Sequence, residues 1–238
     1  MERIDCLPGN LKIIQSDEVF SYSIDAVLLA HFAHTRPFSR VVDLCAGNGA
    51  VGLMLSQKTK GKIDMVEIQS RLAEMAERSV QLNGLEEQVN VIHDDLNNAL
   101  HYIEHDSVDC LVCNPPYFDC HDQNKVNPNP YLALARHEIT FQLEQLMNTA
   151  RQLLKTKGHL YLVHRPSRLL DIIHSMEAAQ IAPKRIQFVY PKKEKEANIV
   201  LVEGMKQGKK NGLVIMPPLI VHQENNKYTA EVEKILHG

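Results

Sequence analysis

The tetrapeptide Asn114-Pro115-Pro116-Tyr117 has the residue types best suited to catalysis in this chain of 238 residues. The lone pair of an aromatic amine is delocalised into its ring, so an enzyme that methylates it must localise this pair with hydrogen-bond acceptors. The side-chain oxygen of Asn114 and the backbone carbonyl of Pro115 can each accept one N–H. The two prolines restrict φ and lack N–H groups, which makes the loop rigid. We therefore predict methyl transfer to a planar amine or amide, with these four residues as catalytic residues.

Aromatic rings continue beyond the tetrapeptide. Tyr117 and Phe118 offer faces on which a flipped-out base can stack, a contact worth about 1–3 kcal/mol per base. Residues 114–137 are rich in Asn, Pro and Asp and too long for an ordinary connection. We therefore expect them to form a substrate-binding loop.

A glycine-rich turn lies upstream, where Asp43-Leu44-Cys45-Ala46 leads into Gly47-Asn48-Gly49. Such glycines let the backbone turn sharply from a strand into a helix and approach a cofactor closely. With Gly52, and with Glu67 twenty residues after Gly47 as a ribose ligand, the spacing also satisfies the dinucleotide fingerprint. Asp43 favours S-adenosylmethionine, because a carboxylate attracts its amino and sulfonium groups but repels a pyrophosphate.

A third acidic position, Asp94-Asp95-Leu96, follows an expected strand. A carboxylate there can accept a hydrogen bond from the amino group of the cofactor's adenine. We favour Asp95 over Asp94 for this role, although an acid at a helix N-terminus also has a purely structural explanation as a cap.

The elements that must position these residues alternate along the chain from about residue 40. Apolar runs of strand length and amphipathic helical stretches predict an α/β fold, Rossmann-like, with a mostly parallel twisted sheet of about seven strands and helices on both faces. We expect one domain over 1–238, with residues 1–38 as a helical N-terminal extension. Strands are predicted at 40–44, 62–67, 89–93, 108–113, 159–163, 185–190, 198–204 and 212–216. Helices are predicted at 23–33, 50–58, 69–83, 138–155 and 167–179, with a short one after residue 95.

Cysteine usage and the N-terminus favour a cytoplasmic protein. Five cysteines at irregular spacing argue against a disulfide framework. Residues 1–5 carry charges where a signal peptide needs an apolar run, and we find no 18-residue apolar stretch, so neither export nor a membrane span is expected. Cys110 and Cys113 have the spacing of half a metal site, but strand geometry points them to opposite faces, and Cys120-His121 is a poor pair. We expect no metal.

Charge is distributed unevenly along the chain. Residues 1–120 hold 9 Lys+Arg and 18 Asp+Glu, whereas residues 121–238 hold 17 and 11. The basic excess is concentrated in 184–210, which includes Lys192 and Lys193. It indicates either an RNA-binding surface or solvated loops.

Three further segments narrow the prediction: 20–30 (Phe-Ser-Tyr-Ser-Ile-Asp-Ala-Val-Leu-Leu-Ala), 135–138 (Ala-Arg-His-Glu) and 226–229 (Asn-Lys-Tyr-Thr). With the motifs above, they resemble the bacterial tRNA(Val) adenine-N6-methyltransferase family. The resemblance implies a class I S-adenosylmethionine-dependent methyltransferase that modifies the adenine next to the anticodon of a tRNA. Arg136 would contact a phosphate and His137 would lie at the mouth of the loop. The residues assigned to the cofactor are Asp25, Asp43, Gly47, Asn48, Gly49, Glu67, Ile68, Asp95, Leu96 and Asn114. Those assigned to the substrate are Tyr117, Phe118, Arg136, Lys192 and Lys193.

Other functions stay open at this point. The tetrapeptide also suits a glutamine amide of a release factor or the N2 amine of a guanine in ribosomal RNA. The glycine pattern alone would also fit an NAD(P)-dependent oxidoreductase, and a cofactor-binding RNA chaperone without catalysis is a further alternative.

Overall fold

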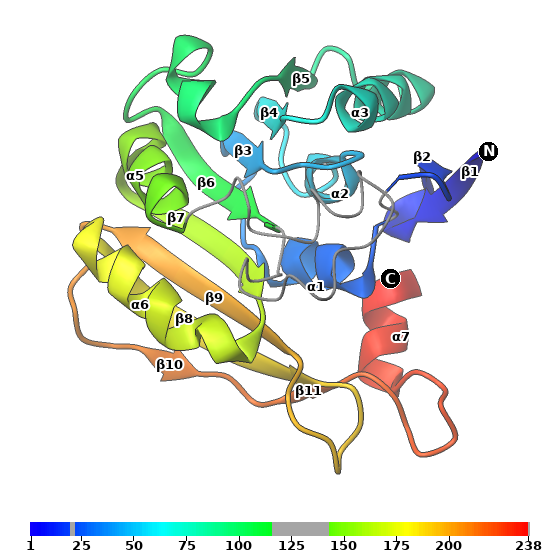
Figure 1. Cartoon of the computed structure of the whole chain (residues 1–238), viewed down its shortest axis with the longest axis vertical. Coiled ribbons are helices and arrows are strands. Elements are labelled where there is room, and N and C mark those ends of the chain that lie inside the picture. The colour runs from blue at the N-terminus through cyan, green and yellow to red at the C-terminus, as the bar shows by residue number, and fades with distance from the viewer. Residues whose placement is uncertain (20–21, 116–142, 238) are drawn as a thin grey trace, which may run out of the picture.

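A twisted sheet with helices on both faces forms the centre of the computed structural model, which describes residues 1–19, 22–115 and 143–237 (Figure 1). Its seven longer strands lie in the order β5-β4-β3-β6-β7-β9-β8, and the short β10 and β11 both pair with β8. Only β9 is antiparallel to its neighbours, so the expected mostly parallel α/β fold is confirmed. The strands are β3 (Val41–Leu44), β4 (Ile63–Glu67), β5 (Val89–His93), β6 (Val108–Cys113), β7 (Leu154–His164), β8 (Ile181–Tyr190), β9 (Ile199–Lys206), β10 (Val214–Ile215) and β11 (Leu219–Ile220).

Two large clusters of buried apolar side chains cover the two faces of the sheet. The first contains residues of α1, α2, α3 and α7, and the second contains residues of η2, α5 and α6. Cys110 belongs to the first cluster and Cys113 to the second, which confirms that they are core residues on opposite faces. The helices are α1 (Ile24–Phe32), α2 (Ala50–Ser56), α3 (Ser70–Leu82), η2 (Leu96–His101), α5 (Leu143–Leu153), α6 (Leu169–Ala178) and α7 (Ala230–His237).

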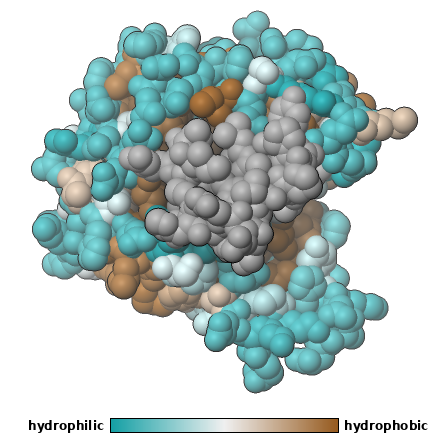
Figure 2. All heavy atoms as spheres, in the orientation of Figure 1, coloured by the Kyte–Doolittle hydropathy of each residue, from teal (hydrophilic) through white to brown (hydrophobic). Residues whose placement is uncertain are grey.

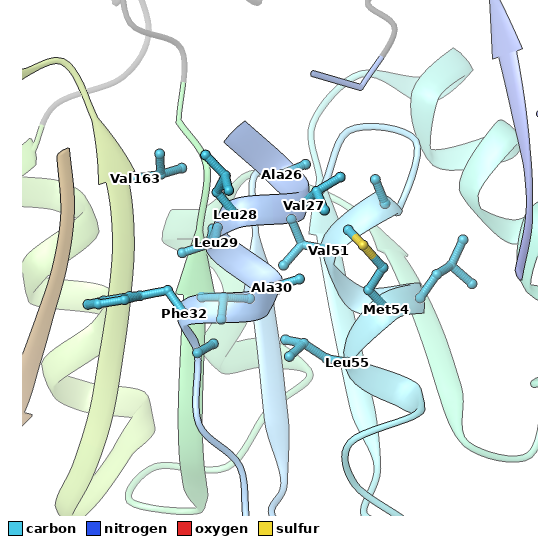
Figure 3. Close-up of a cluster of buried hydrophobic side chains, with 14 of the residues drawn as sticks. Ala26, Val27, Leu28, Leu29, Ala30, Phe32, Val51, Met54, Leu55 and Val163 are labelled. Carbon is cyan, nitrogen blue, oxygen red and sulfur yellow. The ribbon is translucent and has the colours of Figure 1, made fainter. Parts of the chain in front are cut away.

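Helix α1 is buried on nearly every side because it packs between the sheet and α2. Figure 3 shows Leu28 and Leu29 near Val163 of β7, while Val27 lies toward Val51 and Ala30 toward Leu55, both of α2. The buried residues of α1 therefore lie on more than one face of the helix. Across the described part of the chain, no helix is long and apolar enough to cross a membrane.

The prediction of a helical N-terminal extension is wrong for its first half. Residues Glu2–Leu7 (β1) and Leu11–Ser16 (β2) form an antiparallel hairpin, closed by Pro8–Asn10 (η1). Pro8 lacks the N–H that a helix interior needs, and Gly9 has a φ of 77°, so the chain turns here. The hairpin packs on α3, and the predicted helix follows it as α1.

Other differences lie in the C-terminal half. Helix α5 ends at Leu153, and β7 begins at Leu154 rather than at residue 159, passing through Lys157 with a φ of 64°. Lys157 and Gly158 lie inside this strand, whose pairing with β6 is irregular between Val108 and Cys110. Residues 138–142 of the predicted helix lie outside the described residues. Strand β11 and helix α7 were not predicted.

Candidate cofactor and substrate site

Four parallel strands end at one edge of the sheet and bring the sequence motifs together. Leu44 at the end of β3 pairs with Val66 of β4 on one side and with Cys113 of β6 on the other. Glu67 of β4 pairs with His93 of β5. The glycine-rich turn, Glu67, the Asp94-Asp95 pair and Asn114 therefore lie at the carboxyl ends of adjacent strands, where open α/β sheets bind their ligands (Figure 1).

The glycine-rich turn needs glycine for two different reasons. Gly47 has a φ of 58°, and a Cβ placed there would meet no atom of the described residues within 4 Å. None of these residues blocks the approach of a ligand to the backbone at this point. At Gly52, a Cβ would lie 2.4 Å from the sulfur of Met65, so this glycine allows α2 to pack closely on β4.

Asp43 is fully buried below this turn. Its Oδ2 accepts a hydrogen bond of 2.9 Å from the Gly52 N–H, whereas its Oδ1 has no partner among the described residues. Burial raises the pKa of this carboxyl from 3.8 to about 8. A buried carboxyl oxygen without a donor is costly, and a cationic or N–H-bearing ligand at this edge would relieve the cost.

Glu67 connects the glycine-rich turn to the start of α3. Its two oxygens accept hydrogen bonds of 2.8 Å each, from the Gly47 N–H and from the Gln69 N–H. Burial raises its pKa, and these bonds oppose the increase. The sequence predicts Glu67 as a ribose ligand but does not reveal its contact with Gly47. The neighbouring Ile68 is 46% exposed and offers an apolar surface beside the carboxylate.

The two acids after β5 differ in the number of hydrogen bonds that their carboxylates accept. Asp94 accepts hydrogen bonds from the Asp95 N–H at 2.7 Å and from the side chains of Asn98 and Tyr102 at 2.8 Å. The hydrogen bond from Asn98 is the main cause that lowers its pKa. Asp95 caps η2 through Oδ1, which accepts from Asn97 at 2.8 Å, and no other described residue donates to its Oδ2. This arrangement favours Asp95 as the cofactor ligand, and the neighbouring Leu96 is half-buried.

The other residues predicted to bind the cofactor or substrate differ in burial and in their contacts. Asn114 is half-buried and Pro115 buried, directly after β6. Asp25 is buried in the first turn of α1. The side-chain amide of Asn48 donates a hydrogen bond to the Ile14 carbonyl of the hairpin at 3.0 Å. The predicted residues outside the described part of the chain are Pro116, Tyr117, Phe118, Arg136 and His137.

Lys192 and Lys193 lie apart from these residues, in the connection after β8. Strands β7 and β9 separate β8 from β6. Within the described residues, no cluster of three or more His, Cys, Asp or Glu side chains is arranged to hold a metal ion.

Comparison with known proteins gives consistent matches. The sequence profile of the methyltransferase small domain family matches residues 10–179. A tRNA1(Val) (adenine(37)-N6)-methyltransferase of Aliivibrio salmonicida is 28% identical over 68% of this chain and 64% of its own length. A protein of the same name from Parabacteroides distasonis is 28% identical over 75% of this chain and 74% of its own length. The crystal structure of a predicted O-methyltransferase from Agrobacterium tumefaciens superposes with a TM-score of 0.69 at 24% identity, over 89% of this chain and 94% of that one.

Proposed function

The chain belongs to the methyltransferase small domain family, and from this premise we propose that it transfers a methyl group from S-adenosylmethionine to the N6 amine of an adenine in tRNA, in the cytoplasm. The observation that carries the proposal is the position of Asn114 and Pro115, at the end of β6 beside the glycine-rich turn of β3. We propose that these two residues supply the hydrogen-bond acceptors for a planar amine and that the turn beside them holds the cofactor.

The residues at this edge fit S-adenosylmethionine, which supplies an electrophilic methyl group on a positively charged sulfur. Among the described residues, none donates a hydrogen bond to the buried Oδ1 of Asp43, which suits the cofactor's positive charge. The open backbone at Gly47 gives room for close approach, and Glu67 has carboxylate lone pairs for ribose hydroxyls. Ile68 suits the face of the cofactor's adenine, and Asp95 its amino group.

Asn114 and Pro115 act on the amine of the target base. Their oxygens accept its two N–H groups and draw the nitrogen lone pair out of conjugation with the ring. The same contacts stabilise the positive charge that develops on the nitrogen during transfer. Tyr117 and Phe118 are proposed to stack on the base.

Adenine in tRNA is favoured over the alternative substrates because both relatives described above are named for that activity. The basic excess in residues 121–238 is consistent with an RNA partner. The names of these relatives also support tRNA(Val) as the substrate, with the adenine next to its anticodon as the methylated position. The glycine pattern that left an oxidoreductase open is accounted for by the family assignment.

Replacing Asn114 with Ala tests the proposal. With purified protein, tRNA and labelled S-adenosylmethionine, we expect transfer to fall by about 100-fold or more, as for loss of one positioned hydrogen-bonding group at a transition state. Cofactor affinity, measured by calorimetry, should change far less. Asn148→Ala is a matched control, because Asn148 is exposed on α5, on the helix that follows the predicted loop.

Transfer by Asn114→Ala at the wild-type rate would contradict the proposed role of this residue. Incubation with a release factor in place of tRNA distinguishes the substrates. Methylation of the protein and not of the RNA would assign the glutamine alternative.

A further inference from the structure

A second surface lies at the same edge of the sheet as Asn114. Strand β9 is antiparallel to both β7 and β8, so β8 ends at the edge where β6 and β7 end. Three strand spacings separate β8 from β6, which at about 4.8 Å each is about 15 Å. The connection after β8 therefore lies within reach of a polymer whose target base is held at Asn114.

This connection and the turn before α7 enclose an open hollow of about 530 Å³, lined by Pro191, Lys192, Lys195, Glu196 and His222. The ring of His222 stacks on that of Tyr228, with 5.0 Å between centroids and 22° between planes. The Nδ1 of His222 lies 3.2 Å from the Pro191 carbonyl, which fixes the orientation of the ring. In Figure 1 the turn before α7 lies at the lower right of the molecule, and Figure 2 shows hydrophilic residues there.

The turn that carries Tyr228 is well ordered by its own hydrogen bonds. The Gln223 N–H donates to the Lys227 carbonyl at 2.8 Å, and the Thr229 N–H donates to the Val221 carbonyl at 3.0 Å. Tyr228 nevertheless keeps 37% of its surface exposed. A rigid, partly exposed ring loses little entropy when a ligand stacks on it.

We propose that His222, Tyr228, Lys192 and Lys195 form a nucleotide subsite for the RNA substrate, here called the stacking subsite. A base of the same RNA chain, outside the target adenine, stacks on Tyr228, and the phosphate of that nucleotide lies near the two lysines. At about 3.4 Å per stacked nucleotide, the separation of about 15 Å between β6 and β8 corresponds to about four nucleotides. This inference rests on the proposed function.

Stacking contributes more than charge to RNA binding at this subsite, because positive and negative side chains around it are nearly equal in number. Residues 191–196 contain three lysines and two glutamates. A net charge of one attracts RNA only weakly, whereas an aromatic contact binds any base through its face. Glu196 can also accept a hydrogen bond from a base amine.

The test is fluorescence anisotropy of a labelled tRNA transcript, titrated with the full chain. Tyr228→Ala should raise the Kd for tRNA by about tenfold, and Tyr228→Phe should keep the wild-type Kd because it retains the ring. Tyr228→Leu, which keeps apolar contact with His222, should behave like Tyr228→Ala. The affinity for S-adenosylmethionine should be unchanged in all three variants. Phe38→Ala is the matched control, because Phe38 is 76% exposed and precedes β3 at the opposite edge of the sheet.

The lysines have a separate readout in the salt dependence of binding. Lys192→Ala and Lys195→Ala should each lower the slope of log Kd against log salt by about 0.7, whereas Lys60→Ala, an exposed lysine before β4, should leave it unchanged. Wild-type affinity in both Tyr228→Ala and Tyr228→Leu would overturn the stacking subsite and leave the proposed function intact. A wild-type chain that binds cofactor but no tRNA would overturn both.

Discussion

Replacing Asp43 with Asn should make the ligand-free protein more stable at neutral pH while weakening cofactor binding. The pKa of the buried Asp43 is raised from 3.8 to about 8, so the folded chain holds a proton at pH 7 that the unfolded chain has released. This difference favours the folded state most at acidic pH, and the advantage is lost as the pH rises toward about 8. At about 1.4 kcal/mol per unit of pH, the loss between pH 3.8 and pH 7 is about 4 kcal/mol.

An asparagine at this position cannot ionise and avoids this loss. Its carbonyl can still accept from the Gly52 N–H, but its NH2 group then takes the place of the Oδ1 that lacks a partner, at a cost of about 1–3 kcal/mol. We therefore expect a net stabilisation of about 1–3 kcal/mol at pH 7, which raises the Tm of a chain of this size by about 2–10 °C.

Thermal unfolding of the wild type and of Asp43→Asn between about pH 4 and pH 8 measures this directly. The difference in Tm should widen as the pH rises through this interval. Asp171→Asn, whose side chain is 59% exposed on α6, is the control and should give no such trend. If the Tm difference between Asp43→Asn and the wild type were the same at both ends of the interval, the raised pKa of Asp43 would be contradicted. In calorimetry, the variant should bind S-adenosylmethionine at least about tenfold more weakly, because an asparagine, unlike Asp43, cannot lose a proton and offset the cofactor's positive charge.

Two further substitutions test contacts that hold elements of the fold together. Asn48→Ala removes the donor to the buried Ile14 carbonyl, and chemical denaturation should show a loss of about 1–3 kcal/mol; unchanged stability would mean that the hairpin does not depend on this bond. Glu203 joins three strands through His159, at 2.6 Å, and Arg185. Burial, the largest influence, raises its pKa, but these two hydrogen bonds outweigh burial, and the folded pKa lies below 4.5. The wild type should therefore be more stable than Glu203→Gln above about pH 4.5, and the Tm values should converge as the pH falls below it; a difference that persists into acid would contradict this.

The sequence was sufficient to predict the strands that carry the site. Val41–Leu44, Ile63–Glu67, Val89–His93 and Val108–Cys113 are short apolar runs typical of buried parallel strands. Because the carboxyl ends of such strands meet at one edge, the sequence alone predicts that the acids and glycines that follow them lie together.

Contacts between distant residues could not be predicted in this way. The amide of Asn48 belongs to the glycine-rich turn but bonds to Ile14 in a hairpin that the apolar pattern did not reveal. Likewise, Gly47 and Glu67 meet through a backbone N–H, which has no sequence signature. The stacking of His222 on Tyr228 depends on how β11 and α7 return to the sheet. Each of these contacts is set by tertiary packing rather than by local pattern.

Mass spectrometry of tRNA nucleosides from a strain that lacks this gene tests the central claim most directly. The proposed function predicts that N6-methyladenosine disappears from one tRNA position and returns when the wild-type gene, but not Asn114→Ala, is supplied. N6-methyladenosine in tRNA that is unchanged by the deletion would contradict the assignment of adenine in tRNA as the substrate.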